Sequence, residues 1–385
     1  MNSTTTKLEN LWEEVRELSL GTTPQIDRLN TPPTPIQFLR HYLSQNKPFI
    51  LSASAATTLN WPATTLWTST TYLLNTLSSS PISLHLTPTG QADSLVPLPS
   101  NPDSLCFASA AVRKTSFSDA IDAINSSHKK DGLNVGFVAY AQQQNDCFRA
   151  EYGALAGDCD SDISWATEAI GQLPEAVNLW IGNEYSETSF HKDHYENLYA
   201  VVTGEKHFVL LPPTDVHRMY IKEYPAAKYS YSEETGEFEL ELENPPRYVP
   251  WCSVNPFPLP ENKEKEISEF PLYYNGPKPF KVTVKAGEIL YLPSMWFHHV
   301  RQTPDNRGLT IAVNYWYDMQ FDIKYAYFNF LQSLEAPLEL VCHQSSSNTS
   351  ERFVRDRLNV DNSVLNEDVA DGDGNHKEEA TLTTV

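Results

Sequence analysis

The sequence predicts a mainly β domain, a barrel or jelly roll, with helices at its flanks. Between residues 135 and 316 it contains many short strand patterns separated by glycine and proline turns, which is typical of these folds. Amphipathic helical patterns occur near both ends of this region. The 385 residues suffice for one large domain with flanking structure, or for two modest ones. A chain of this length can bury a hydrophobic core that needs no disulfides or structural metal to be stable.

Residues 1–30 are predicted to form an N-terminal amphipathic helix and a linker. Thr6 and Glu9 have the spacing of a capping box, and apolar residues recur at helical spacing from Leu8 until Gly21. We expect this helix to pack on its own domain, with a contact to a second subunit as the alternative.

Residues 31–125 are predicted to form an α/β region that flanks the main domain. Prolines break the chain before it, and turn residues follow its last strand pattern. Its predicted elements are helices at 36–42 and 67–77 and strands at 48–51 and 82–86. None of these patterns carries chemistry by itself.

Residues 126–343 are predicted to form the main β domain. Its strands are expected at 135–140, 177–181, 199–202, 207–211, 280–284, 289–292 and 309–316. The segment 221–279, rich in tyrosine, proline and glutamate, is predicted to be an insertion that lies over one face as a lid or binding loop. A helix at 319–336 should close the domain. Residues 344–385 are predicted to be a disordered acidic tail.

The charge of the chain narrows the class of partner. A formal net charge of −21 argues against direct binding of nucleic acid or of an anionic membrane. It favours a cationic substrate, although acidic residues also serve solubility alone. The 5 cysteines are scattered and never form a CxxC pair, so we expect reduced thiols. No signal segment or membrane span is evident, and we expect a cytoplasmic protein that could also enter the nucleus.

The candidate metal ligands begin at His191-Lys192-Asp193. In an extended strand, residues i and i+2 point to one face, so His191 and Asp193 could reach one cation. With a distant second histidine they would form the 2-His-1-carboxylate set that holds Fe(II) in oxygen-activating enzymes. His194 and Glu196 repeat the pattern on the opposite face. Asn197 continues the face of His191 and Asp193, and this polar set favours the first pair.

The third ligand comes from a more specific pattern. Gly287, Pro293 and His298 have the spacing of the second motif of the cupin and jumonji C superfamily, which this chain resembles. The resemblance implies a double-stranded β-helix, and it implies that His298, not the adjacent His299, completes the metal site.

The same resemblance implies a site for 2-oxoglutarate. A lysine at the start of a strand is usually solvated, but Lys206 follows Gly204 as the co-substrate anchor does in the jumonji C pattern. Fe(II), 2-oxoglutarate and O2 are therefore the expected cofactor and co-substrates. Further contacts to 2-oxoglutarate, or the walls of its pocket, are expected from Thr188, Tyr140, Asn197 and Asn314.

Within the superfamily the chain looks like the jumonji-domain-containing protein 7 group, described as bifunctional peptidase and (3S)-lysyl hydroxylase. The resemblance covers residues 30–335 and depends on the runs 191–199, 204–208, 290–293, 296–300 and 312–319. It implies hydroxylation of a protein lysine at C3, in a GTPase of the developmentally regulated, translation-factor class.

Three alternatives to lysyl hydroxylation stay open at this point. The first is demethylation of histone lysines, and the second is proteolysis of histone tails, which would need a polarised water that no HExxH pattern supplies. The third is a binding module without enzymatic activity. A homodimer is expected, through the first or the last helix.

Overall fold

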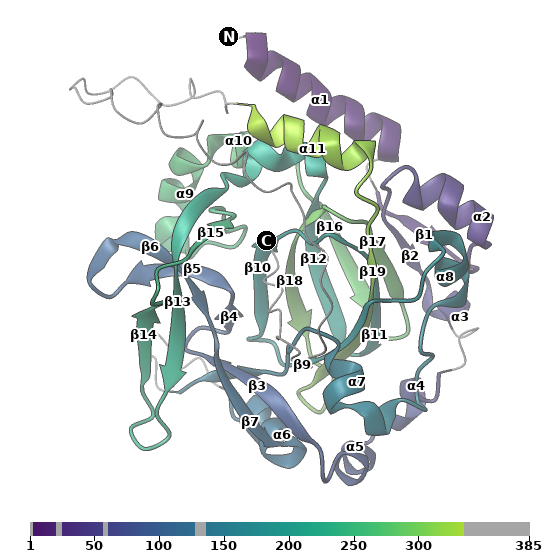
Figure 1. The fold of residues 1–385 in the computed structure, drawn as a ribbon, viewed down its shortest axis with the longest axis vertical. Helices are drawn as coiled ribbons and strands as arrows, with labels where there is room; N and C mark the ends of the chain where they lie inside the picture. Colours follow the sequence, from purple (N-terminus) through teal and green to yellow (C-terminus); the bar gives the residue numbers. More distant parts are fainter. Residues whose placement is uncertain (1–2, 21–24, 57–60, 128–135, 335–385) are drawn as a thin grey trace, which may run out of the picture.

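The centre of the computed structural model is a pair of facing sheets, which confirms the double-stranded β-helix (Figure 1). The structure describes residues 3–20, 25–56, 61–127 and 136–334. The first sheet contains, in spatial order, β1 (Asp27–Leu29), β2 (Phe49–Leu51), β17 (Ile289–Leu292), β11 (Tyr195–Thr203), β19 (Thr310–Asp318) and β9 (Ala176–Gly182). The second contains β16 (Phe280–Lys285), β12 (Glu205–Leu211), β18 (Phe297–Thr303), β10 (Glu187–His191) and β4 (Gln91–Ala92).

Side chains alternate between two cores along the central strand β11. Tyr199 and Val201 point between the sheets, where they share a cluster with Phe208 of β12. Leu198 and Ala200 point outward into a larger cluster that includes the flanking helices. Because both faces of this sheet are buried, its strands appear in the sequence as nearly continuous apolar runs.

The outer core is covered by short helices and by a small antiparallel sheet of β7 (Ala111–Ser116), β3 (Pro81–Thr87) and β8 (Val138–Tyr140). The α-helices here are α2 (Pro35–Phe38), α3 (Ala53–Ala56), α4 (Ala63–Leu66), α5 (Thr70–Thr76), α6 (Phe117–Asn125), α7 (Cys147–Glu151) and α8 (Ser164–Ile170). A π-helix (Leu39–Leu43) continues α2, and a 3-10 turn (Gly153–Leu155) follows α7. Thr34 and Gln37 cap α2 reciprocally.

The predicted loop at 221–279 is wrong, because this segment forms strands. It contains β13 (Lys222–Tyr231), β14 (Phe238–Leu242) and β15 (Tyr248–Trp251), then a 3-10 turn (Pro260–Asn262), α9 (Lys263–Glu269) and α10 (Pro271–Asn275). β13 pairs in parallel with β6 (Asn101–Ser109), which also pairs with β5 (Ser94–Leu98). Aromatic residues, in place of aliphatic ones, supply the buried apolar surface of these strands. One example is the contact of Trp251 with Phe107, whose ring centroids lie 4.7 Å apart.

Strands from both sides of residue 125 share sheets. β1, β2 and β4 extend the two central sheets, and β6 joins the 221–279 segment to the N-terminal region. The N-terminal flanking region and the main β domain are therefore hydrogen-bonded together.

At one end of the molecule α1 (Ser3–Leu20) lies beside α11 (Ile323–Ser333) (Figure 1). α1 begins three residues before the predicted cap at Thr6, and α11 is shorter than the helix predicted at 319–336. α1 packs on the 3-10 helix η4 (Pro213–Met219) of its own chain. The indole of Trp12 is 1% exposed and donates to the carbonyl oxygen of Thr214 at 3.0 Å. The predicted tail at 344–385 lies outside the described residues.

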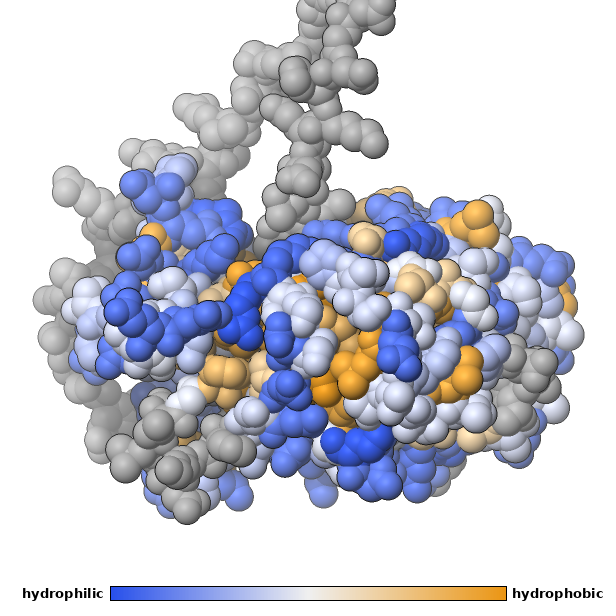
Figure 2. Space-filling view, turned by 90° about the horizontal axis from the view of Figure 1, so that it is seen from below, coloured by the Kyte–Doolittle hydropathy of each residue, from blue (hydrophilic) through white to orange (hydrophobic). Residues whose placement is uncertain are grey.

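None of the described helices has the length and apolar character to cross a membrane. The face of the molecule shown in Figure 2 is covered mostly by hydrophilic side chains, with hydrophobic ones in separate patches. The described cysteines Cys106, Cys147, Cys159 and Cys252 are buried free thiols.

The contact between α1 and η4 includes a buried carboxylate held by two guanidinium groups. Asp215 accepts from Arg16 at 2.7 and 3.1 Å and from Arg218. We expect Asp215→Asn to lower the free energy of unfolding by about 3–5 kcal/mol, because two buried cations would lose their counter-ion. Arg16→Met should cost only about 1 kcal/mol, because Asp215 keeps Arg218. Urea unfolding measures both, and equal losses would contradict this account.

Candidate metal centre and co-substrate pocket

Two strands of the second sheet bring the candidate histidines together. His191 is the last residue of β10 and pairs in register with His298 on the antiparallel strand β18. Asp193 is not on the same strand as His191, so the prediction that the two residues share one strand face is wrong. The two side chains still converge. The chain leaves β10 at His191 and enters β11 of the opposite sheet at Tyr195, and Asp193 lies in the connection. Its carbonyl oxygen accepts from the backbone N–H of Met295 at 2.8 Å, which holds the connection in place.

Both imidazoles direct Nε2 at the same carboxylate oxygen. His191 Nδ1 lies 2.8 Å from the carbonyl oxygen of Ser189, and His298 Nδ1 lies 3.0 Å from that of Trp296. Since a carbonyl only accepts, Nδ1 carries a proton in each ring, which leaves Nε2 as the nitrogen that can bind a metal. The Nε2 atoms lie 3.8 and 3.6 Å from Oδ2 of Asp193.

The donor set fits a divalent cation. One potential ligand atom from each of His191, Asp193 and His298 lies within 4.8 Å of the others. Among the described residues, these three form the cluster of histidine and acidic side chains that could hold a metal ion. Oδ1 of Asp193 is buried without a hydrogen-bond partner, which is costly for a carboxylate unless a cation is bound. Burial and the neighbouring His191 lower the pKa of His298 well below its usual value, so this imidazole is neutral, as a metal ligand must be.

The indole of Trp251, from the 221–279 segment, supports His191. The two rings are parallel, with an interplanar angle of 3° and centroids 6.2 Å apart. Trp251 Nε1 donates to Ser189 Oγ at 3.1 Å. This segment therefore forms part of the wall around the candidate metal centre.

The overlapping pair His194 and Glu196 has a structural role instead. Glu196 is buried and accepts from the hydroxyl of Tyr291 at 2.6 Å and from the hydroxyl of Ser294 at 2.8 Å. The ring of His194 packs on Phe321, 5.9 Å away. The preference for His191 and Asp193 therefore agrees with where the side chains point.

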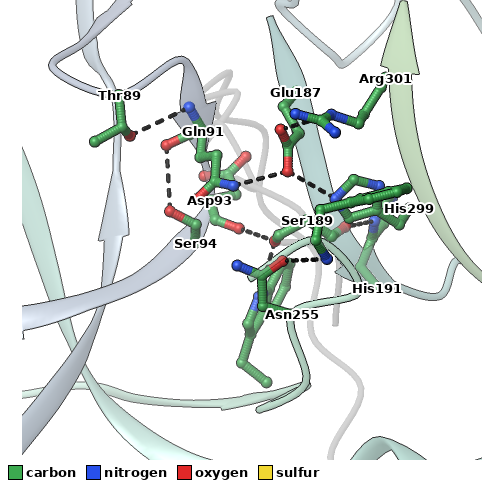
Figure 3. Close-up of polar contacts among 12 residues, drawn as sticks. Thr89, Gln91, Asp93, Ser94, Glu187, Ser189, His191, Asn255, His299 and Arg301 are labelled. Carbon is green, nitrogen blue, oxygen red and sulfur yellow. Dashed lines mark hydrogen bonds and ion pairs between the residues drawn. The ribbon is translucent and has the colours of Figure 1, made fainter. Parts of the chain in front are cut away.

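The adjacent histidine His299 faces away from the metal centre. Its Nε2 lies 2.8 Å from Glu187, which also accepts from Gln91 at 2.7 Å and contacts Arg301 at 3.1 Å (Figure 3). Burial raises the pKa of Glu187, but the hydrogen bond from His299 and the charges of His299 and Arg301 outweigh this effect, and the net shift is downward. This network links β4, β10 and β18 next to the metal ligands.

A polar cavity opens beside the triad and continues between the sheets. Tyr140, Thr188, Asn197 and Asn314 all line it, together with Trp180 and Phe208. Asn314 donates to Asn197 at 3.2 Å and accepts from the indole of Trp180 at 2.8 Å, so the orientation of both amides is defined.

Lys206 lies on β12 of the second sheet, opposite the sheet that contains β11 and Asn197. Its side chain extends into the interior toward Tyr140 in the wall of this cavity. Lys206 is 1% exposed, and its ammonium donates to the hydroxyl of Tyr140 at 2.9 Å. No described carboxylate pairs with it. Burial lowers the pKa of Lys206 to about 7, a cost that a bound anion would offset.

Asp93 also lines the cavity, and no pattern in the sequence had indicated it. It is the one residue between β4 and β5 and has a φ of 54°, in the left-handed region. Its backbone places it beside Ser189, near His191 (Figure 3). Burial raises the pKa of its carboxyl group, against the charges of His85 and His191.

This fold, with two imidazoles and a carboxylate beside a cavity between the sheets, defines the class of metal-dependent cupin-fold oxygenases. A family model for the cupin-like domain matches residues 35–323. The chain belongs to this cupin-like jumonji C family of 2-oxoglutarate oxygenases, which generally use Fe(II) and 2-oxoglutarate.

Curated relatives match most of the chain. It is 62% identical over 328 residues to "Lysine-specific demethylase JMJ32" of Arabidopsis thaliana, covering 85% of this chain and 91% of the relative. It is 38% identical over 306 residues to "Bifunctional peptidase and (3S)-lysyl hydroxylase JMJD7" of Homo sapiens, covering 80% and 88%. It is 37% identical over 319 residues to "JmjC domain-containing protein E" of Dictyostelium discoideum, covering 80% and 88%.

Two neighbouring carboxylates separate metal binding from folding. We expect Asp193→Asn to weaken Mn(II) binding about 100-fold or more, because it removes the anionic ligand. Glu196→Gln should leave Mn(II) affinity unchanged and lower the free energy of unfolding by about 1–3 kcal/mol, through its hydrogen bonds to Tyr291 and Ser294. Calorimetric titration with Mn(II) and urea unfolding measure the two effects. The reverse pattern would move the metal site to His194 and Glu196.

Proposed function

We propose that the protein hydroxylates a lysine of a protein substrate at C3, using Fe(II), 2-oxoglutarate and O2. The observation that carries the proposal is the convergence of His191, Asp193 and His298 at a cavity whose wall residue Tyr140 accepts a hydrogen bond from the buried Lys206. The printed name of the human relative adds the (3S)-lysyl hydroxylase activity. A GTPase of the developmentally regulated, translation-factor class is the proposed substrate.

The residues of the chain would divide the work as follows. His191, Asp193 and His298 would hold Fe(II) on one face of its coordination sphere and leave other positions open. Lys206 and the hydroxyl groups of Tyr140 and Thr188 would bind the far carboxylate of 2-oxoglutarate. When bound, iron and co-substrate supply the oxidising power that inserts one oxygen atom of O2 into a C–H bond while 2-oxoglutarate is converted to succinate and carbon dioxide.

No acid or base is needed at the carbon that reacts, so the position of the substrate decides the product. The apolar rings of Trp180 and Phe208 line the cavity and would limit the access of water to the reacting groups. The outcome of the reaction therefore depends on which carbon the cavity walls present to the metal.

The second candidate function is demethylation of a protein lysine. It is favoured by the relative at 62% identity, whose printed name is lysine-specific demethylase. The chemistry at the metal is the same, and only the carbon differs: an N-methyl group in place of C3. The peptidase activity in the printed name of the human relative has less support, because no HExxH pattern occurs in the chain.

The products distinguish these functions. We expect the purified protein with Fe(II) and 2-oxoglutarate to add one oxygen atom to a lysine of the recombinant GTPase, with one succinate formed for each hydroxylation. His191→Ala should abolish both products, because a metal ligand is lost. Peptide mass spectrometry and a succinate assay provide the measurements. Loss of a methyl group from a methylated histone peptide, without hydroxylation of the GTPase, would favour the demethylase.

Binding of 2-oxoglutarate should depend on pH through Lys206. The buried amine is half protonated at about pH 7, and a bound carboxylate would raise its pKa, so binding at pH 8 should take up a proton. Affinity should therefore fall above pH 7, by up to about tenfold per pH unit. Calorimetry of the Mn(II) protein in buffers of different ionisation enthalpy measures this uptake.

Lys206→Arg is the matched control for proton uptake, because a guanidinium stays charged throughout this pH range. It should abolish the proton uptake even if it weakens binding, whereas Lys206→Met should weaken binding at every pH. Uptake that persists in the arginine variant would assign the proton to another group.

A further inference from the structure

We propose that Asp93 binds the ammonium group of the substrate lysine, inside the cavity that holds the metal centre. The inference rests on the proposed function and adds the residue that selects the lysine. Lysyl hydroxylation requires a group that recognises the amine, and none of the metal ligands or co-substrate residues is free to do so.

Asp93 is the carboxylate in the cavity that remains available for a cation. Two acidic side chains line the cavity, Asp93 and Asp193, and Asp193 faces the two histidines. Glu187 is nearby but is already neutralised by His299 and Arg301 (Figure 3). A positively charged guest would therefore find its counter-ion at Asp93.

The carboxylate of Asp93 has no partner within the described part of the chain. No described group donates a hydrogen bond to it or forms an ion pair with it, although its backbone oxygen is bonded. A carboxylate that is largely removed from water without donors is unfavourable. A lysine ammonium has three N–H donors and a positive charge, and so satisfies this group with charge-assisted hydrogen bonds.

The position of Asp93 is coupled to the metal centre. Ser189 Oγ donates to the backbone oxygen of Asp93 at 2.6 Å, and Trp251 Nε1 donates to the same Ser189 Oγ at 3.1 Å. Trp251 in turn stacks on the ring of His191. A left-handed φ of 54° is tolerated by aspartate and asparagine better than by most residues, so the backbone at this position suits an aspartate.

The remaining walls suit an extended alkyl chain with a polar end. Gln142 and Gln144 line the cavity with Asp93, and the indole of Trp316 adds an apolar surface. Asp93 is outside the metal donor set but in the same cavity. In the proposed binding mode the ammonium pairs with Asp93, and a methylene carbon of the same side chain faces the metal. Demethylation would instead require the nitrogen substituent at the metal, and each added methyl group removes one N–H donor.

The test compares Asp93→Asn with wild type, because asparagine keeps the shape and the left-handed backbone and removes only the charge. The probes are three peptide pools with randomised flanks and a central lysine, dimethyl-lysine or norleucine. Their retention on immobilised Mn(II) protein with 2-oxoglutarate, without O2, is quantified by mass spectrometry. Asp103→Asn, an exposed carboxylate, is the matched control for net charge.

We expect wild type and Asp103→Asn to retain lysine peptides preferentially. Asp93→Asn should bind them about 10- to 100-fold more weakly, and its preference for lysine over norleucine should disappear. Asp103→Asn should leave Mn(II) affinity and turnover of 2-oxoglutarate without peptide unchanged. Asp93→Glu should recover part of the preference.

Retention of the lysine preference by Asp93→Asn would overturn the inference, as would preferential binding of dimethyl-lysine by wild type. Failure of the proposed function gives a different result. In that case wild type with Fe(II) and O2 adds no oxygen to any retained lysine peptide, although the effect of Asp93→Asn on binding persists.

Discussion

The antiparallel pairing of β10 with β18 is the constraint on which the metal centre depends. It places His191 opposite His298, and each ring bonds through Nδ1 to the carbonyl oxygen two residues earlier on its own strand. The geometry of the strands therefore defines the orientation and the tautomer of both imidazoles. Asp193 reaches them from the connection that leads to the opposite sheet, so the site forms only where the two sheets meet.

In the proposed function, different segments of the chain serve cofactor chemistry and substrate recognition. The central sheets and the connection between them supply the three candidate metal ligands, Lys206 and the two asparagines of the cavity. Other segments add to its surroundings: β8 contributes Tyr140, the junction of β4 and β5 contributes Asp93, and the 221–279 segment contributes Trp251, which stacks on His191. In such an arrangement, proteins with different activities can share the metal and co-substrate residues, because the residues around the substrate determine which carbon approaches the metal.

Several predictions from the sequence failed for a physical reason. Strand periodicity identified β11 and β12 but carried no information on which strands pair, so it did not show that these two strands lie in opposite sheets. His191 and Asp193 are two residues apart in the sequence whether both lie on one strand or the strand ends between them. In the structure β10 ends at His191, and Asp193 lies in the connection that follows. The segment 221–279 has few aliphatic residues, and its strands depend on tyrosine and tryptophan, which a search for aliphatic alternation overlooks. Asp93 is a single residue between two strands and has no motif.

By itself the amino-acid sequence indicated a barrel or jelly roll, because strand periodicity is a local pattern. The resemblance to the cupin and jumonji C superfamily, which the local motif from Gly287 to His298 carries, implied the double-stranded β-helix. It also narrowed the metal ligands to a few candidates. Only the tertiary structure decided which of the overlapping acidic residues faces the histidines, and how Lys206 contacts the cavity wall at Tyr140. It also decided that, among the residues described, none forms a hydrogen bond or ion pair with the carboxylate of Asp93. Those properties depend on pairing between segments far apart in the chain and on burial, and neither is encoded in the spacing of neighbouring residues.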